Sequence, residues 1–274
     1  MNLSKIKIPK PVIIKEIEKN SPYVKTFTLQ SYIKGHKFEN VAPGKFCNIW
    51  IPNLDMKPFS ISDFENNLIS FTVKKIGKTT TYMHEKLKKG DKIGLMGPLG
   101  KGFNIQGKNI LLIGGGFGLA PLRYLLNELI KKKLNIISLL GFKSEPDIFF
   151  LEIFEKKSNN LHITTEDGCM GEQGRCTDQL DYIFEENKID QIYCCGPEPM
   201  MVKVLAFAIE HNINAQFSLE RYIGCGIGLC GKCALNGKFR VCIDGPVINS
   251  LNLKELSDFG EFKLTKNGSK IKIE

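Results

Sequence analysis

The sequence predicts an antiparallel β-barrel, then an α/β domain with a mostly parallel, Rossmann-like sheet, and then a small cysteine-rich module. Three observations support this order. They are short apolar segments bounded by Pro, Gly and Asn near the start, alternating strand and helix patterns from Lys108, and four cysteines among glycines between residues 225 and 242. The 274 residues suffice for two packed cores. We expect domains at residues 1–106, 107–218 and 219–252, with a C-terminal tail at residues 253–274.

The composition is that of an ordinary globular protein, with 42% hydrophobic and 24% charged residues and no apolar run long enough to cross a bilayer. The formal charge is +9, but lysine-rich stretches such as "EKLKKGDK" contain no interleaved aromatics, which disfavours nucleic-acid binding. The start of the chain breaks its apolar residues with Lys and Pro and shows no signal-peptide cleavage site. We therefore expect a cytoplasmic protein. In that reducing compartment, nine cysteines indicate metal binding or catalysis rather than disulfides.

The barrel is expected from short apolar or alternating segments at residues 24–30, 44–52, 68–76 and 91–98. Strands so closely spaced favour a small antiparallel barrel. "MKPFSIS", at residues 56–62, is expected at a strand edge, and "KKIGKTTTYMHEKL", at residues 74–87, contains a short helix.

The α/β domain is expected to begin with "NILLIGGG", a buried strand that ends in glycines at residues 109–116. A helix with Pro121 at its start then places apolar residues on one face, namely Leu122, Leu125, Leu126, Leu129 and Ile130. Strands follow at residues 135–142, 161–168, 191–198 and 215–220, with helices at residues 177–187 and 199–212. This alternation predicts helices on both faces of the sheet.

The four clustered cysteines, Cys225, Cys230, Cys233 and Cys242, have the spacing C-x4-C-x2-C-x8-C. The first three match the plant-type [2Fe-2S] run. Glycines between them allow the close backbone approach and positive φ angles that a loop around a cluster needs. A zinc ribbon is the alternative, but it usually shows two C-x2-C pairs, whereas only Cys230 and Cys233 have that spacing here. We expect the other cysteines to be buried and inert, namely Cys47, Cys169, Cys176, Cys194 and Cys195.

Two glycine-containing turns indicate a nucleotide site. "LLIGGGFGLAPL" contains Gly114, Gly115, Gly116 and Gly118 after a strand and before a helix, which is the setting of a phosphate-binding turn. A second turn, Cys195, Gly196 and Pro197, follows a later strand. Parallel strands end at the same sheet edge, where ligands bind, so the two turns together predict nicotinamide binding. In the barrel, a cation (Lys57), an aromatic ring (Phe59) and hydroxyls (Ser60, Thr79 and Thr80) near a helix start suit a flavin with a diphosphate tail.

With these segments assembled, the chain resembles the ferredoxin-NADP reductase superfamily, and more specifically the electron transfer subunits of NAD-dependent (class 1B) dihydroorotate dehydrogenases. The motifs "KPFSI", "VKKIGKTT", "GPLGKGF", "IGGGFGLAPL", "CGPEPMM", "SLERYIGCGIGLCGKC" and "VCIDGP" occur in the family's order. The resemblance implies FAD binding by Lys57, Pro58, Phe59, Ser60, Thr72, Val73, Lys74, Thr79 and Thr80. Two positions depart from the family pattern: Lys57 replaces an arginine and Thr79 replaces a glycine.

The resemblance also implies a mechanism and a partner. A partner subunit carrying FMN would oxidise dihydroorotate, and single electrons would pass through the [2Fe-2S] cluster to FAD, which would reduce NAD+, in pyrimidine (UMP) biosynthesis. We expect a heterotetramer of two plus two subunits and no catalytic residue for dihydroorotate in this chain. One alternative is the flavin and [2Fe-2S] subunit of a ferredoxin-linked NAD(P)H oxidoreductase or sulfide dehydrogenase, relatives that tend to lack a cysteine at the position of Cys225. Another is a non-catalytic binding module stabilised by zinc.

Overall fold

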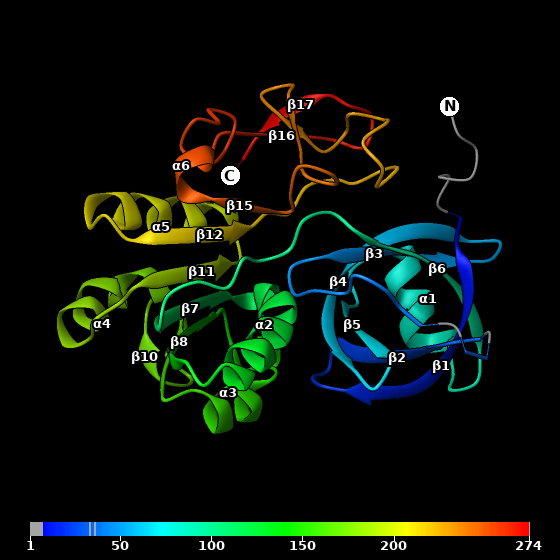
Figure 1. The fold of residues 1–274 in the computed structure, drawn as a ribbon, viewed down its shortest axis with the longest axis horizontal. Helices are drawn as coiled ribbons and strands as arrows, with labels where there is room; N and C mark the ends of the chain where they lie inside the picture. Colours follow the sequence, from blue (N-terminus) through cyan, green and yellow to red (C-terminus); the bar gives the residue numbers. More distant parts are fainter. Residues whose placement is uncertain (1–7, 33, 36, 274) are drawn as a thin grey trace.

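The computed structural model describes residues 8–32, 34–35 and 37–273. Two bodies lie side by side, a barrel and an α/β domain, and the C-terminal segments run along one face of the pair (Figure 1). Residues 1–7, which contribute to the expectation of no signal peptide, lie outside the described residues. Within the described chain, no helix combines the length and apolar character needed to span a bilayer.

The N-terminal domain is a closed barrel of antiparallel strands in the order β1-β2-β5-β4-β3-β6. Its strands are β1 (Lys10–Lys19), β2 (Val24–Ser31), β3 (Phe46–Ile51), β4 (Asp55–Glu65), β5 (Leu68–Lys74) and β6 (Lys92–Leu99), and α1 (Lys78–Lys86) follows β5. Side chains that alternate along each strand fill the interior, where Phe27 pairs across with Phe71. The expected strands are confirmed, and β1 is an addition that sequence reasoning missed.

The second domain is a seven-stranded sheet in the order β10-β9-β8-β7-β11-β12-β15. All neighbouring strands are parallel except β12 and β15, which pair antiparallel. The strands are β7 (Asn109–Gly115), β8 (Asn135–Phe142), β9 (Asn160–Thr165), β10 (Glu172–Gln173), β11 (Gln191–Cys195), β12 (Asn214–Ser218) and β15 (Val247–Asn249). The predicted barrel and parallel sheet are thus confirmed.

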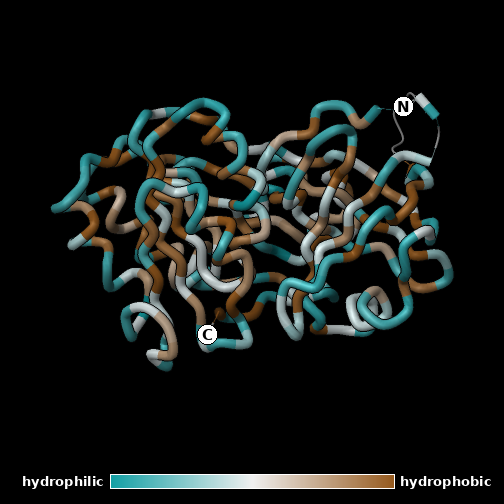
Figure 2. Tube along the Cα trace, turned by 90° about the horizontal axis from the view of Figure 1, so that it is seen from below, coloured by the Kyte–Doolittle hydropathy of each residue, from teal (hydrophilic) through white to brown (hydrophobic). Residues whose placement is uncertain are grey.

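Helices cover both faces of this sheet. On one face, α2 (Leu119–Lys131) and α3 (Leu151–Lys157) share a core with Ile110 and Leu112 of β7. On the other, α4 (Leu180–Glu186) and α5 (Glu198–Glu210) share a core with the alternate β7 residues, Leu111 and Ile113. Hydrophobic segments accordingly lie mainly inside the two domains and hydrophilic segments at the outer loops (Figure 2).

Helix α2 begins two residues before the expected start at Pro121. The short 3-10 turn η2 (Gly116–Gly118) leads directly into it, and proline is tolerated in the first helical turn because the N–H groups there have no intrahelical partner. The predicted apolar face is confirmed, since its four leucines are fully buried. Tyr124, on another side of α2, belongs to the core of the barrel. Helix α2 therefore packs against both domains.

The C-terminal part contains two small hairpins and a one-turn helix. These are β13 (Ala234–Leu235) with β14 (Phe239–Arg240), α6 (Ser250–Leu253), and β16 (Phe262–Leu264) with β17 (Lys270–Lys272). Leu256 and Phe259 share a core with Leu235, Cys233 and Cys242. The terminal residues thus form part of the support of the cysteine-rich segment.

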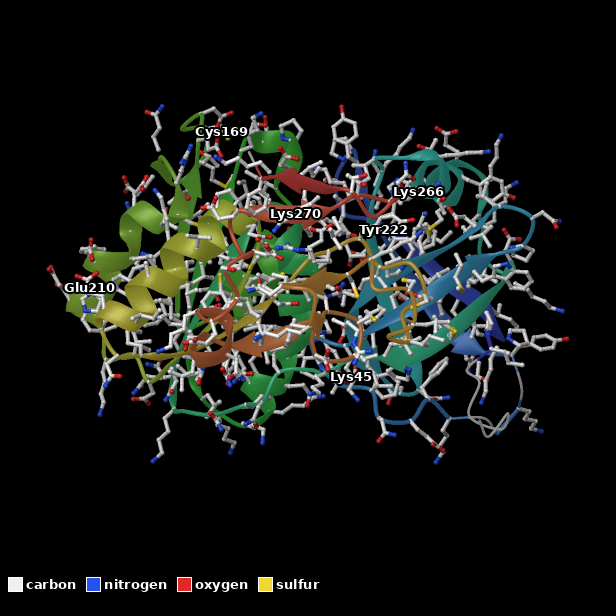
Figure 3. The ribbon with its side chains drawn as sticks, turned by 90° about the horizontal axis from the view of Figure 1, so that it is seen from above. Lys45, Cys169, Glu210, Tyr222, Lys266 and Lys270 are labelled. Carbon is white, nitrogen blue, oxygen red and sulfur yellow. The ribbon has the colours of Figure 1, made fainter. Side chains whose placement is uncertain are left out.

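The five scattered cysteines differ in their surroundings. Cys47, Cys176 and Cys194 are buried, as expected, and Cys195 is half-buried. The expectation of burial is wrong for Cys169, which is exposed at the outer edge of the α/β domain (Figure 3). Its loop turns at Gly168 and Gly171, both with positive φ, and carries charged neighbours rather than an apolar cover.

Candidate functional site

The two predicted glycine turns lie in contact with one another. They follow β7 and β11, which are neighbours in the sheet, with Cys195 paired to Gly114. A Cβ added at Gly118 would collide with the carbonyl oxygen of Cys195, and one added at Gly196 would lie 3.0 Å from the Cα of Gly115. Only glycine permits this approach, so both turns present bare backbone at one sheet edge, as a bound diphosphate requires.

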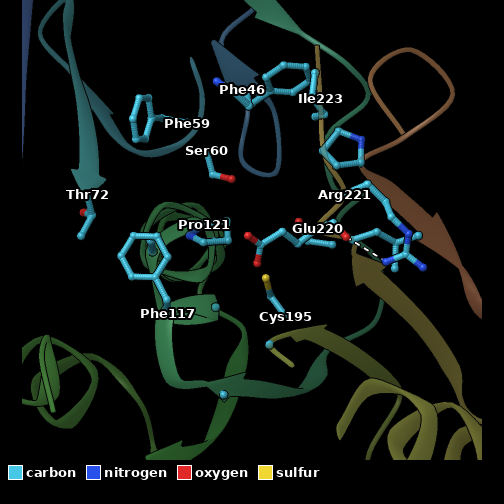
Figure 4. A pocket seen from close by; sticks show the side chains of 18 of the residues that line it. Phe46, Phe59, Ser60, Thr72, Phe117, Pro121, Cys195, Glu220, Arg221 and Ile223 are labelled. Atoms are coloured by element: carbon cyan, nitrogen blue, oxygen red, sulfur yellow. Dashed lines mark hydrogen bonds between the residues drawn. The ribbon is translucent and has the colours of Figure 1, made fainter. Parts of the chain in front are cut away.

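A cavity of about 270 Å³ opens beside these turns (Figure 4). Three parts of the chain line it: barrel strands, the glycine turns with the start of α2, and the segment that leads toward the clustered cysteines. The lining residues are Phe46, Pro58, Phe59, Ser60, Thr72, Gly115, Phe117, Gly118, Ala120, Pro121, Cys195, Gly196, Pro197, Ser218, Leu219, Glu220, Arg221, Ile223 and Pro246. Four of the sequence-predicted flavin residues and five of the predicted nicotinamide residues therefore meet at one place.

The thiol of Cys195 points into this cavity near the carboxylate of Glu220 (Figure 4). Burial, reinforced by the negative charge of Glu220, raises the pKa of Cys195 to about 12, although a hydrogen bond with Ser218 opposes the rise. The thiol is therefore neutral at physiological pH and offers the cavity a weak hydrogen-bonding group rather than a nucleophilic thiolate.

A second cavity of about 640 Å³ shares Gly115, Phe117 and Pro197 with the first and continues over the ends of β8 and β9. The charged residues in its lining are Lys74, Lys143, Asp147, Glu166, Arg175 and Lys203. In the described part of the chain, the buried hydroxyls of Thr164 and Thr177 in this lining have no hydrogen-bond partner. Buried hydroxyls normally find partners, so they are suited to a polar ligand.

Several expected FAD residues lie outside both cavities. Lys57 forms an ion pair with Asp55, with 2.8 Å between Nζ and Oδ2, and Thr79 donates a 3.4 Å hydrogen bond to the same oxygen. Hydrogen bonding by Lys57, aided by its charge, lowers the pKa of Asp55 despite partial burial. The two departures from the family pattern therefore meet at one carboxylate.

The remaining expected residues have mainly structural contacts. The hydroxyl of Thr80 accepts the N–H groups of Ile76 and Gly77 at the start of α1, each at 3.0 Å. Val73 is fully buried in the barrel core, and Gly114 lies under Leu119. Lys74 lines the larger cavity and pairs with Asp147 at 2.9 Å, which links the barrel to the α/β domain.

The four clustered cysteines lie in a loop shaped by glycines with positive φ: 75° at Gly226, 76° at Gly228 and 71° at Gly231. The backbone N–H groups of Ile227, Leu229 and Cys230 donate to the Cys225 sulfur at 3.2–3.5 Å. Burial opposes ionisation of this thiol, but the donated hydrogen bonds outweigh burial and lower the pKa of Cys225 to about 7. This loop therefore supplies N–H donors toward a sulfur, as iron-sulfur sites do.

The other thiols complete two contacting pairs. Cys225 interacts with Cys230, and Cys233 with Cys242. Burial, followed by interaction with Cys233, raises the pKa of Cys242 to about 12. Across residues 8–32, 34–35 and 37–273, no three His, Cys, Asp or Glu side chains are grouped to hold a single metal ion. A two-iron cluster takes two thiolates on each iron, so this pairing fits a [2Fe-2S] cluster.

Sequence reasoning missed much of the cavity lining. Phe117 and Pro121 lie within the glycine motif, and Glu220 and Arg221 lie just before the cysteine loop, but the sequence predicts none of them as a binding residue. The ends of β8 and β9 were also overlooked, although ligands bind at the carboxyl ends of parallel strands. Glu145, shortly after β8, lines neither cavity, whereas Glu166, directly after β9, lines the larger one.

Two family models and one solved structure match this chain. A family model described as "Iron-sulfur cluster binding domain of dihydroorotate dehydrogenase B" matches residues 220–254, and one described as "Oxidoreductase NAD-binding domain" matches residues 112–205. The structure of an NADH-dependent reduced ferredoxin-NADP oxidoreductase, solved for insight into flavin-based electron bifurcation, has a TM-score of 0.76 and 29% identity and matches 94% of each chain.

Curated relatives are similar over nearly the whole chain. A "Probable dihydroorotate dehydrogenase B (NAD(+)), electron transfer subunit" from Methanocaldococcus jannaschii is 42% identical, covering 96% of this chain and 98% of the relative. A protein of the same name from Methanothermobacter thermautotrophicus is 35% identical, covering 98% and 99% respectively. By this similarity, together with the paired thiols and the joined glycine turns, the chain belongs to the family of electron transfer subunits of dihydroorotate dehydrogenase B (NAD+).

Proposed function

We propose that this chain carries electrons from an FMN-containing catalytic subunit, through a [2Fe-2S] cluster and FAD, to NAD+ during oxidation of dihydroorotate. The observation that carries the proposal is the shared cavity beside Cys195. The barrel, the nucleotide turns and the segment leading to the cluster cysteines all line it. A flavin placed there would therefore contact both its electron donor and its electron acceptor segments.

Family membership confirms the broader expectations of an NAD-dependent oxidoreductase subunit with FAD, [2Fe-2S] and NAD as cofactors. When bound, the flavin supplies the link between two-electron exchange with nicotinamide and one-electron exchange with a cluster. Overall, dihydroorotate loses two electrons and two protons. NAD+ takes up both electrons and one proton as a hydride, and the second proton goes to solvent.

We assign the residues by their place in the two cavities and the cysteine loop. FAD would be held by the barrel face made of Pro58, Phe59, Ser60 and Thr72, with Lys57, Val73, Lys74, Thr79 and Thr80 supporting the adjoining strand and helix start. NAD would be held by Gly114, Gly115, Gly116, Gly118, Cys195, Gly196 and Pro197. The cluster would be held by Cys225, Cys230, Cys233 and Cys242. The neutral thiol of Cys195 and the bare backbone of the glycine turns would orient the nicotinamide without adding charge.

The proposed partner carries FMN and the dihydroorotate chemistry, in a complex of two plus two subunits. Exposed apolar side chains at the cysteine loop support a docking role for this edge: Leu229 is 80% exposed and Ile227 is 48% exposed. Exposed apolar groups beside redox ligands suit a protein interface better than water. A cytoplasmic location is part of the proposal, because the four thiols of the cysteine loop need a reducing environment until iron binds.

The test is co-expression of this chain with a class 1B catalytic subunit from the same source and anaerobic purification. NADH formation on adding dihydroorotate should require this chain, and each copy should hold two irons and one FAD. Cys225→Ser should remove the cluster and the dihydroorotate-driven NADH signal while NADH-driven dye reduction persists. Cys169→Ser, at the exposed cysteine outside the loop, is the matched control and should change neither.

A second candidate is a subunit of a ferredoxin-linked NAD(P)H oxidoreductase, favoured by the match to the NADH-dependent reduced ferredoxin-NADP oxidoreductase along nearly the whole chain. That role predicts a protein loaded with flavin and cluster that reduces dyes with NADH but never couples to dihydroorotate. This result would overturn the main proposal.

A further inference from the structure

A buried ion pair joins two segments that line the cavity. The side chains of Arg221 and Glu198 are only 3% and 9% exposed, and they contact each other through two parallel hydrogen bonds. Glu198 begins α5, directly after the Cys195–Gly196–Pro197 turn, whereas Arg221 lies shortly before the first cluster cysteine. Fork-to-fork pairing of this kind fixes orientation as well as distance.

A third segment of the chain also binds the carboxylate of Glu198. The backbone N–H of Gly260 donates to Glu198 Oε1 at 2.6 Å. Two residues earlier, Asp258 exchanges hydrogen bonds with Asn236 in the β13–β14 hairpin, at 2.7 and 2.9 Å. The C-terminal segment therefore ties the cysteine-rich module to the same carboxylate that Arg221 binds.

The ion pair lies beside the cavity that is proposed to hold the flavin. Arg221 lines the cavity beside Cys195, and its Nε is buried without a hydrogen-bond partner among the described residues. Buried ion pairs are seldom the most stabilising choice, since hydrophobic residues of similar size often do as well. Stability is therefore a weak reason for charges here, and a role in positioning or in electrostatics is the better account.

We propose that Arg221 and Glu198 are a positioning pair that holds the nicotinamide turn and the cluster-bearing segment in a fixed arrangement and balances charge beside the flavin. The inference rests on the proposed function. A cation alone at this place stabilises the reduced, more negative cofactor, whereas an anion alone destabilises it. The intact pair cancels most of both effects.

The test compares Glu198→Gln, Arg221→Gln and the double variant in the purified complex, with redox titrations of FAD by absorbance and of the cluster by electron paramagnetic resonance. Glu198→Gln leaves the arginine unbalanced and should raise the FAD potential. Arg221→Gln leaves the carboxylate unbalanced and should lower it, and the double variant should return toward the wild-type value. If the FAD potential moved in the same direction in both single variants, or did not move, the charge-balancing role would be overturned.

The positioning role has its own readout. Arg221→Lys keeps the charge but loses the fork, so its FAD potential should stay close to wild type. NADH-driven cluster reduction should slow by roughly 10- to 100-fold in this variant. Losses of that size are typical when a residue that orients metal ligands is mutated. Unchanged cluster reduction would overturn the positioning role.

Two controls separate the possible failures. Glu128→Gln, in an exposed ion pair of α2 with Lys131, should alter neither potential nor rate. Iron and FAD are counted in every sample, because a wild-type protein lacking them would contradict the proposed function itself. A loaded wild type whose variants behave like the control would contradict this inference alone.

Discussion

At the scale of single residues, the nucleotide turns depend on how closely two backbones approach. Gly118 has ordinary helical dihedral angles, so its role lies in its missing side chain rather than in backbone freedom. Any Cβ there would displace the carbonyl of Cys195 and with it the neighbouring Gly196. The motif "GGGFG" indicated a phosphate turn, but contact with a second turn depends on the sheet order, which no single motif reveals.

We expect Gly118→Ala to push the two turns apart. Overpacking of this kind costs about 1–3 kcal/mol of unfolding free energy. Because displacement of a binding group by about 1 Å can cost on the order of 100-fold, the KM for NADH should rise at least severalfold. Steady-state dye reduction and thermal unfolding measure the two effects. Gly35→Ala is the control, since Gly35 has φ 79° and open space around it, and should lower stability only. An unchanged KM in Gly118→Ala would show that the turns tolerate separation.

At the scale of elements, the sequence predicted best where a segment forms its own pattern. The leucines of α2 follow helical periodicity, and the strands of the barrel carry alternating or continuous apolar runs. Prediction failed where an element depends on distant partners. Strand β1 mixes its apolar residues with Lys, Glu and Pro, and β15 is three residues long and exists because β12 offers it an edge. Likewise, no local sequence pattern predicts Arg221 as a cavity residue, because its partner Glu198 lies at the start of a helix that is distant in the sequence.

Helix α1 gives an element-scale prediction through His84. Its side chain is buried, and its Nε2 lies 2.8 Å from the carbonyl oxygen of Val73 in β5. Burial lowers the pKa of His84 from 6.5, with the Val73 hydrogen bond opposing and the Lys25 and Lys75 charges adding. The folded state thus favours neutral histidine, so protonation of His84 opposes folding.

The direction in which stability changes with pH depends on which state of the chain binds the proton more readily. The unfolded chain binds a proton at His84 more readily, so this stabilisation is complete above about pH 6.5 and is lost as the pH falls through the lower folded pKa. His84→Gln should therefore flatten the decline of the unfolding midpoint between pH 7.5 and 5. Thermal unfolding followed by circular dichroism at several pH values provides the measurement. Parallel curves for the two proteins would contradict the assignment.

At the scale of the whole molecule, α2 holds the two domains together around the cavity. Asp63 of the barrel accepts hydrogen bonds from Asn127 at 2.9 Å and Arg123 at 3.4 Å, both on α2. Arg123 also lies over the ring of Phe150, 4.7 Å from its centre, and Tyr124 is inserted in the barrel core. Since both domains line the proposed flavin cavity, loosening this contact should affect cofactor retention as well as stability.

Asp63→Ala should therefore destabilise the protein and weaken FAD binding together. It leaves two partly buried donors unpaired, which costs about 1–3 kcal/mol. Glu128→Ala, on the same helix, breaks only the exposed pair with Lys131 and should cost under about 1 kcal/mol with no loss of FAD. Thermal unfolding and the FAD released on gel filtration distinguish the two variants. If the two variants had the same stability and released the same amount of FAD, Asp63 would contribute no more than a surface ion pair. Tyr124 and the apolar contacts alone would then set the domain arrangement.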